Sequence, residues 1–315
     1  MKRIICLSLV LAVLFGAVLT GCGSKNNQNN SNNGSASANS GSEGSHSSQT
    51  ATDAPVQATG GKVHIQDNVL GDIWITELEG VERNKLDNSG FSTENGLKVY
   101  TENGSKASMA GIDVSYNCGN IDWKKVKEAG IDFVMVRLGG RGYGDEGSLY
   151  SDEKALEYIN GAKQNGIKVG GYFFSQATTN DEAVEEAKYA VSTLNGLKLD
   201  FPLAYDWEII KDDNARTDGV SSAQATECAK AFCDEIKNQG FTPMIYSPSK
   251  ELYFKYDLAR LKDIDIWYCE YAEVPSFYYQ FSMWQYSDKG KVDGIDTEVD
   301  LNICFTNVAH YNFFY

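Results

Sequence analysis

The run Phe201-Pro-Leu-Ala-Tyr-Asp-Trp-Glu208 is short and apolar, and it ends in two carboxylates, Asp206 and Glu208. Side chains two residues apart on a strand point to the same face of the sheet. If this run forms a strand, both acids project together from its carboxyl end, while Tyr205 and Trp207 point the opposite way. In a parallel barrel, active sites are built at that end of the strands.

Two carboxylates in one pocket push their pKa values apart, so that one holds a proton while the other stays charged. Glycoside hydrolysis uses such a pair. Taken alone, Asp206 and Glu208 also fit an edge strand that carries two solvated acids. The choice between the two interpretations therefore depends on the rest of the chain.

Strands and helices alternate on both sides of this run. Short apolar runs separated by helical patterns indicate a parallel sheet. Strands are expected at residues 111–115, 133–138, 168–175, 201–208, 242–247, 265–271, 281–287 and 299–304. Helices are expected at 123–129, 152–164, 181–194 and 222–238, with a shorter helical stretch before residue 261. This order favours an α/β barrel whose last part is irregular.

Carboxylates recur at the ends of other predicted strands. Asp113 belongs to the first strand and Asp300 to the eighth, and closing a barrel makes these strands neighbours. Arg137, near the end of an apolar strand, is expected to pair with a carboxylate. Aromatic side chains near strand ends can stack on sugar rings, although aromatic residues also fill cores; they include Tyr172, Tyr246, Trp267 and Trp284. The barrel is thus expected to gather distant acids at one rim.

The amino terminus has the features of an export signal. Lys2 and Arg3 precede an apolar run, and Leu19-Thr-Gly-Cys22 resembles a bacterial lipobox. We expect residues 1–21 to be a signal peptide, Cys22 to carry lipid, and residues 22–61 to be a flexible Ser/Asn/Gly linker. An ordinary signal peptide with an incidental cysteine is the alternative. The expected location is the outer side of the cell membrane, facing the cell wall.

The remaining boundaries follow from composition and turn signals. Residues 62–108 carry short β-like runs and the turn dipeptides Asn95-Gly96 and Asn103-Gly104, which predict a small β-rich appendage. Residues 109–307 form the predicted barrel and residues 308–315 a tail. The sequence assigns no role to the appendage.

Composition excludes several classes of function. A net charge of −15 argues against a nucleic-acid partner. Three histidines, His46, His64 and His310, are too few and too scattered for a zinc or cysteine peptidase, and no metal or cofactor is expected. The five cysteines after the linker imply no complete disulfide framework, although a Cys118–Cys304 bridge is conceivable if the first and eighth strands are neighbours. The other cysteines include Cys228 and Cys233, which are expected to be small core residues.

Several short motifs, taken together and in order, resemble glycoside hydrolase family 25, the lysozymes of the Chalaropsis type. The resemblance covers roughly residues 110–305. It rests on Gly111-Ile-Asp-Val-Ser115, Gly119-Asn-Ile-Asp-Trp123, Gly170-Gly-Tyr-Phe-Phe-Ser175, Asp206-Trp-Glu208, Ile245-Tyr-Ser247, Trp284-Gln-Tyr286 and Val299-Asp-Leu-Asn302.

The resemblance implies a (β/α)5(β)3 barrel that cleaves the β-1,4 bond between N-acetylmuramic acid and N-acetylglucosamine in peptidoglycan. It implies that Glu208 is the general acid and that Asp206 assists the 2-acetamido group of the substrate. The resemblance also implies that Asp113 belongs to the same catalytic set and that Asp300 lines the pocket beside it. The expected substrate contacts also include Tyr172, Tyr246, Trp284, Gln285 and Arg137. The expected partner is the glycan strand of peptidoglycan, bound by a monomer.

Other functions are compatible with parts of this pattern. The same barrel could be a non-catalytic lipoprotein that binds the cell wall, although all four candidate acids are present. A hydrolase of another glycan such as chitin is disfavoured, because Phe201 and Ala204 occupy places where a chitinase-like pattern has aspartates. A spore or phage lysin is disfavoured by the expected lipid anchor. One departure is Cys118, where many relatives have glutamine beside the cleft.

Overall fold

The computed structural model of the protein describes residues 60–210 and 214–308. Cys22, the signal peptide and almost all of the linker lie outside the described residues, as do residues 309–315 of the tail. No helix in the described part of the chain is both long enough and apolar enough to cross a membrane.

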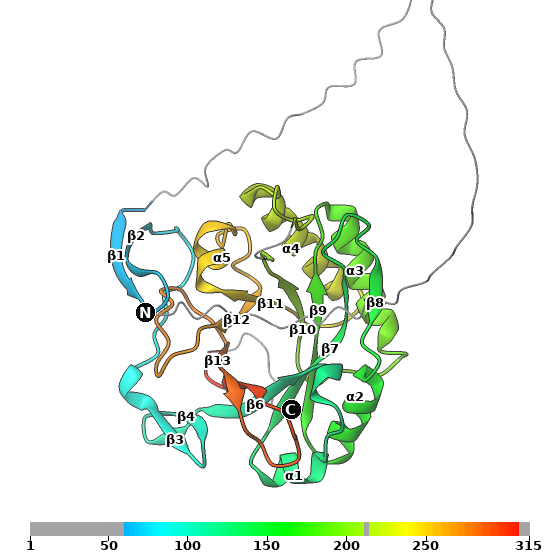
Figure 1. Cartoon of the computed structure of the whole chain (residues 1–315). Helices are drawn as coiled ribbons and strands as arrows, with labels where there is room; N and C mark the ends of the chain where they lie inside the picture. The colour runs from blue at the N-terminus through cyan, green and yellow to red at the C-terminus, as the bar shows by residue number, and fades with distance from the viewer. Residues whose placement is uncertain (1–59, 211–213, 309–315) are drawn as a thin grey trace, which may run out of the picture. The chain divides into compact units, whose positions relative to one another are not determined.

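Eight strands of the described chain close into a barrel (Figure 1). Around the barrel, the order is β6 (Ser108–Val114), β14 (Val299–Phe305), β13 (Met283–Gly290), β12 (Asp265–Cys269), β11 (Pro243–Pro248), β10 (Leu203–Trp207), β9 (Lys168–Ser175) and β7 (Phe133–Arg141). Pairing of β6 with β7 closes the ring, and a short strand, β8 (Leu149–Ser151), pairs with β7 outside it. The chain therefore forms a mixed α/β barrel.

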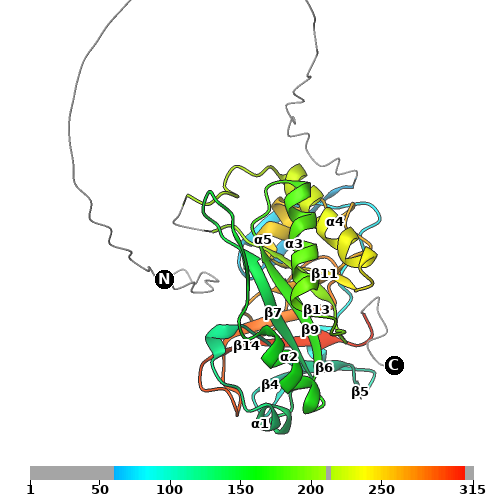
Figure 2. The same ribbon diagram turned by 90° about the vertical axis from the view of Figure 1, so that its right-hand side faces the viewer.

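The five α-helices of the described residues connect successive barrel strands. They are α1 (Trp123–Glu128), α2 (Ala155–Gln164), α3 (Asn180–Thr193), α4 (Ser222–Asn238) and α5 (Ser249–Phe254). Figure 2 shows α2, α3 and α4 on the outer side of the strands. The buried face of α3 carries Ala183, Ala187 and Ala190 at helical spacing, and small side chains let a helix approach the sheet closely. On α4, Cys228 and Cys233 are buried, as the sequence predicts.

Strands β12, β13 and β14 follow one another without α-helices. Part of their outer face is covered by an N-terminal β segment, which consists of β1 (Lys62–Asp67), β2 (Gly71–Thr76), β3 (Phe91–Glu94), β4 (Leu97–Glu102) and β5 (Ser105–Lys106). Its Phe91 ring lies 5.7 Å from Trp284 of β13 and 5.9 Å from Phe305 of β14, measured between ring centroids. The segment thus supplies apolar cover that helices give elsewhere. Its turns at Asn95 and Asn103 have positive φ, as Asn-Gly turns require.

The direction of the last strand corrects the expected parallel sheet. β14 runs antiparallel to both β13 and β6, while the other neighbouring barrel strands are parallel. The start of β14 therefore lies at the rim where the parallel strands end, and Asp300 is paired in register with Asp113. Cys304 pairs in register with Met109 at the opposite end of β6, whereas Cys118 follows the carboxyl end of β6. Both cysteines are free, so the bridge considered between them is wrong.

Candidate active site

Asp206 lies near the end of β10, and Glu208 follows the strand directly. Tyr205 packs on Phe232 of α4 with ring centroids 5.0 Å apart, so this side of the strand faces the helices. Asp206 therefore points inward and is buried, whereas Glu208 follows the last residue of β10 and is half-buried. The side chains of Asp206 and Glu208 are within hydrogen-bonding reach of each other.

The electrostatics of this pair favour retention of a proton. Burial raises the pKa of Asp206 well above its usual range, and the nearby negative charges of Glu208 and Asp113 raise it further. The hydrogen bond with Glu208 acts in the same direction, while the positive charge of Arg137 opposes it. Because the two carboxyls are strongly coupled, the proton belongs to the pair rather than to one residue.

Asp113, on β6, is held in place by two amide side chains. Gln285 Nε2 donates to Asp113 Oδ2 at 2.9 Å, and Asn302 Nδ2 donates to the same oxygen at 2.8 Å. Burial raises the pKa of Asp113, and hydrogen bonds from Asn302, Gln285 and Asp300 partly offset this rise. Asp113 and Asp300 therefore form a second carboxyl pair at the same rim.

The two amide side chains that hold Asp113, those of Gln285 and Asn302, are themselves held by buried hydrogen bonds. Gln285 Oε1 accepts from the hydroxyl of Tyr246 at 2.9 Å and from the thiol of Cys269 at 3.1 Å. Trp267 Nε1 donates to Asn302 Oδ1 at 2.8 Å, which orients the amide of Asn302 toward Asp113. Gln285 and Tyr246, which are also predicted to contact the substrate, are buried to the same degree as Asp113 and Asp206. Gln285 contacts Asp113, and Tyr246 contacts Gln285.

Sequence reasoning missed Asn302 and Trp267 as members of the site. Asn302 follows Asp300 by two residues and so shares its face, which is the same signal that identified Asp206 and Glu208. The sequence places Trp267 only among the aromatic side chains near strand ends. Its role depends on a hydrogen bond to another strand, which its position in the sequence does not indicate.

Tyr172 and Arg137 lie between the two acid pairs. Burial raises the pKa of Tyr172 well above its usual range, and the negative charges of Asp113, Asp206 and Asp300 add to the rise, while Arg137 opposes it. Arg137 Nε donates to Asp152 Oδ2 at 2.8 Å, which confirms the expected pairing with a carboxylate. Its Nη2 atom is buried without a hydrogen-bond partner among the described residues. Arg137 thus supplies a positive charge that acts on Asp206 and Tyr172.

Trp284 is the predicted site residue that the structure places elsewhere. It alternates with the inward-facing Gln285, so its side chain lies on the outer face of β13 and is fully buried. Its Nε1 atom donates to the carbonyl of Glu270 at 2.8 Å, and its ring meets Phe91 edge to face. The prediction that Trp284 contacts a sugar is therefore wrong, because the N-terminal β segment covers that side.

Trp284→Ala is expected to lower the free energy of unfolding by about 3–5 kcal/mol, as for other large core truncations. Trp74→Ala is the matched control, because Trp74 is 64% exposed on β2, and it should cost far less. Denaturant unfolding of both variants measures the difference. Equal costs for the two variants, or an unchanged stability of Trp284→Ala, would contradict the placement of Trp284.

Cys118 lies beside the second acid pair. Burial raises the pKa of its thiol to about 11, and the negative charges of Asp113 and Asp300 contribute to the rise. The thiol is therefore neutral near pH 7.

No group of three or more His, Cys, Asp or Glu side chains within residues 60–210 and 214–308 is arranged to hold a metal ion.

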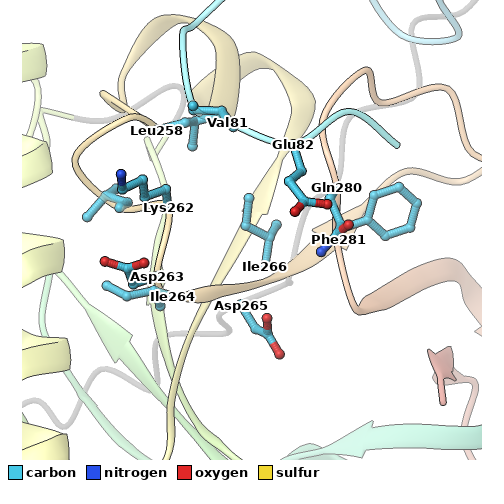
Figure 3. A pocket seen from close by; sticks show the side chains of 12 residues that line it. Val81, Glu82, Leu258, Lys262, Asp263, Ile264, Asp265, Ile266, Gln280 and Phe281 are labelled. Carbon is cyan, nitrogen blue, oxygen red and sulfur yellow. The ribbon is translucent and has the colours of Figure 1, made fainter. Parts of the chain in front are cut away.

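Figure 3 shows the residues that line a cavity. Its volume is about 270 Å³, and none of the four candidate acids lines it. It is lined by Val81 and Glu82 from the loop after β2, by the loop that precedes β12, and by Gln280 and Phe281. Asp265, the first residue of β12, also lines it. The acid pairs lie where the parallel strands end, so this cavity belongs to the opposite end of the barrel.

Residues 112–295 match the family described as glycosyl hydrolases family 25. The autolytic lysozyme of Clostridium acetobutylicum is 31% identical over 196 residues, which cover 62% of this chain and 55% of that lysozyme. Lysozyme M1 of Streptomyces globisporus is 25% identical over 206 residues, covering 62% of this chain and 67% of that protein. This chain therefore spans about half the length of the Clostridium relative.

Solved structures share the fold. The modular autolysin LytC from Streptococcus pneumoniae has a TM-score of 0.56 at 23% identity, over 78% of this chain and 57% of the autolysin. That autolysin is also known in complex with a synthetic peptidoglycan ligand. At this level of identity, the likeness shows a common fold.

Proposed function

This chain belongs to glycosyl hydrolases family 25, and we propose that it is a lysozyme that hydrolyses peptidoglycan. The proposed reaction cleaves the β-1,4 bond between N-acetylmuramic acid and N-acetylglucosamine. The observation that carries the proposal is the meeting of Asp206 and Glu208 with Asp113 and Asp300 at one rim of the barrel. The lysozymes and the autolysin among its relatives support the choice of substrate.

Glu208 is the proposed general acid. It lies beyond the end of β10 and is less buried than Asp206, so its carboxyl is better placed to meet a glycosidic oxygen entering from the rim. The pair retains a proton because burial and like charge raise the pKa of Asp206. Protonation of the leaving oxygen is the role that such a retained proton serves in glycoside hydrolysis.

Asp206 is the proposed partner of the substrate's 2-acetamido group. An N–H donor beside a carboxylate favours its charged form, so binding of the acetamido group shifts the shared proton toward Glu208. Asp206 Oδ1 is buried without a hydrogen-bond partner among the described residues, which leaves it able to accept such a bond. The acetamido oxygen then acts as the internal nucleophile at the sugar C1 atom.

The remaining rim residues have supporting roles in this proposal. Asp113, fixed by two amides, and Asp300 orient the sugar or the attacking water and keep the local potential negative. That potential favours the positive charge that develops on the sugar ring in the transition state. Tyr172, half-buried between the acid pairs, and Arg137 complete the proposed contacts.

The finer description of the chain is also part of the proposal. The barrel corresponds to a (β/α)5(β)3 arrangement over residues 109–307, with an appendage at residues 62–108. We further propose that the protein is exported, that lipid at Cys22 attaches it to the membrane, and that it is a monomer. The linker would then let the barrel reach peptidoglycan above the membrane.

A direct test of the activity follows the turbidity of a suspension of purified peptidoglycan. The full chain is expected to clear the suspension and to release soluble fragments. A protein that binds the suspension and leaves its turbidity unchanged would instead be a wall-binding module.

Mass spectrometry of the mature amino terminus tests the anchor. Cys22 is expected to be the first residue and to carry lipid, and Cys22→Ser should move the protein from the membrane to the soluble fraction. An unmodified amino terminus beyond Cys22 would overturn the anchor and leave the proposed hydrolysis untouched.

A further inference from the structure

The backbone at Glu208 is tied to a neighbouring strand by one buried side chain. The strand pairing of β10 with β9 ends at Trp207, which is paired in register with Ser175. Glu208 follows Trp207, and Gln176 follows Ser175. Gln176 Nε2 donates to the carbonyl oxygen of Glu208 at 3.1 Å. The same nitrogen donates to the carbonyl of Ser175 at 2.9 Å. The amide of Gln176 therefore continues the connection between the two strands by one residue.

Gln176 also contacts Thr217, which precedes α4. Its Oε1 atom accepts from the hydroxyl of Thr217 at 3.2 Å, and both side chains are almost completely buried. A carboxamide is well suited to this place, because it donates two hydrogen bonds and accepts others from one planar group. A carboxylate here would face two carbonyl oxygens, and an apolar side chain would leave them without their donor.

The backbone of Gln176 is held by the ion pair of Glu186 and Arg141, which lies outside the site. Its backbone N–H donates to Oε1 of Glu186 at 3.3 Å, and Arg141 Nε donates to the same oxygen at 2.7 Å. Glu186 lies on the buried face of α3 and also accepts from the hydroxyl of Ser175. These contacts fix the backbone of residues 175–177 and involve none of the four acids of the candidate site. They also provide hydrogen-bond partners for the buried carboxylate of Glu186.

We propose that Gln176 is a positioning residue, which fixes the carbonyl of Glu208 and thereby sets the position of its carboxyl relative to Asp206. This inference rests on the proposed function. Glu208 has left the strand, so its placement depends on side-chain contacts more than that of Asp206, which is paired in register with Phe174 and Tyr246. A general acid must meet its oxygen within about half an ångström of the productive geometry.

The test is Gln176→Met, which keeps the length of the side chain and removes both donated bonds. The expected result is a fall in kcat of about 10²-fold, as for a small misplacement of a reacting group, with KM nearly unchanged. The pH profile of kcat should shift as well, because the coupling between Asp206 and Glu208 depends on their separation. A residue with a purely structural role would lower Tm without moving that profile.

The control variant is Thr226→Val on α4. Thr226 is fully buried, donates to the carbonyl of Ser222 at 2.9 Å and accepts from the N–H of Asp257 at 2.9 Å. The substitution removes the hydroxyl and its buried hydrogen bonds, which do not involve the acids. Tm should therefore fall, while kcat and its pH profile should stay unchanged.

A milder pair of variants covers the case in which Gln176→Met does not fold. Thr217→Val removes only the hydroxyl that donates to Gln176, and it should lower kcat and move the pH profile in the same direction. Thr217→Ser restores the hydroxyl and should restore both. A wild-type kcat and pH profile in Gln176→Met, or in Thr217→Val where the first is unfolded, would overturn the inference and leave the hydrolase standing. An inactive wild-type chain would overturn the proposed function together with the inference.

Discussion

Replacing Glu208 by glutamine is expected to slow peptidoglycan hydrolysis by about 10²–10⁴-fold, which is the usual contribution of a positioned general acid. The amide keeps the size of the carboxyl but has no proton to give to the leaving oxygen. The variant should remain folded, because Glu208 is half-buried beyond the end of β10 and its backbone carbonyl still accepts from Gln176.

Glu128→Gln is the matched control for this substitution. It makes the same chemical change on an exposed side chain of α1, so its rate should equal that of the unmodified chain. The rate is followed by the release of soluble fragments from purified peptidoglycan, and circular dichroism checks the fold. A Glu208→Gln variant with a near-normal rate would remove Glu208 from the reaction.

Asp206→Asn has the second largest expected effect, with a loss of at least about 10²-fold in kcat. The amide cannot carry the negative charge that is proposed to hold the 2-acetamido group. It also removes the partner with which Glu208 shares a proton, so the pH profile of the residual activity should change. A mild effect on kcat would remove Asp206 from the mechanism.

The same substitution is expected to raise Tm near neutral pH. The pKa of Asp206 is raised by burial and by the negative charge of Glu208, so the folded protein resists ionisation of this carboxyl. Asp206 therefore contributes stability while it is protonated at low pH, and this contribution is lost as the pH rises through its raised pKa. Asparagine does not titrate, and the advantage of Asp206→Asn should grow with pH.

Thermal unfolding at several pH values measures this difference. A Tm difference between Asp206→Asn and the unmodified chain that stays constant with pH would contradict the raised pKa of Asp206. Together, a lower rate and a higher Tm would separate a chemical role of Asp206 from a structural one.

The alternation of side chains along a strand predicts that Asp206 and Glu208 share a face, and the buried Asp206 agrees with the barrel interpretation rather than with an edge strand of solvated acids. Two acids at a spacing of two share a face, and the aromatic residues that alternate with them, Tyr205 and Trp207, need apolar partners, which α4 provides for Tyr205. The neighbourhood of the strands that carry Asp113 and Asp300 was also predictable, since barrel closure brings the first and last strands together. The meeting of the two acids at one rim depends in addition on the antiparallel direction of β14, because Asp300 lies at the start of its strand. The sequence pattern does not indicate that direction.

Trp284 and Gln285 show why other parts of the site were not predictable. Alternation states that these two neighbours face opposite ways, but both are buried, so burial alone does not say which one faces the interior of the barrel. The answer depends on Phe91, far away in the sequence, which covers Trp284 from outside. Gln285 then meets Asp113 inside.

Hydrogen bonds between side chains of distant strands could likewise not be predicted from the sequence. Asn302 and Trp267 support Asp113 only because β14, β12 and β6 adopt one particular register. Gln176 appears in the sequence as a polar residue after a strand, which is an ordinary place for glutamine. Its bond to the carbonyl of Glu208 depends on the pairing of β9 with β10.

Identification of the new reducing ends shows which bond is cleaved, and it therefore tests the proposed muramidase activity. Purified peptidoglycan is incubated with the full chain and, in parallel, with the Glu208→Gln variant, and the products are analysed by mass spectrometry. We expect new reducing ends on N-acetylmuramic acid with the unmodified chain and none above background with the variant. New ends on N-acetylglucosamine, or an absence of new ends from a folded chain bound to the wall, would contradict the proposed activity.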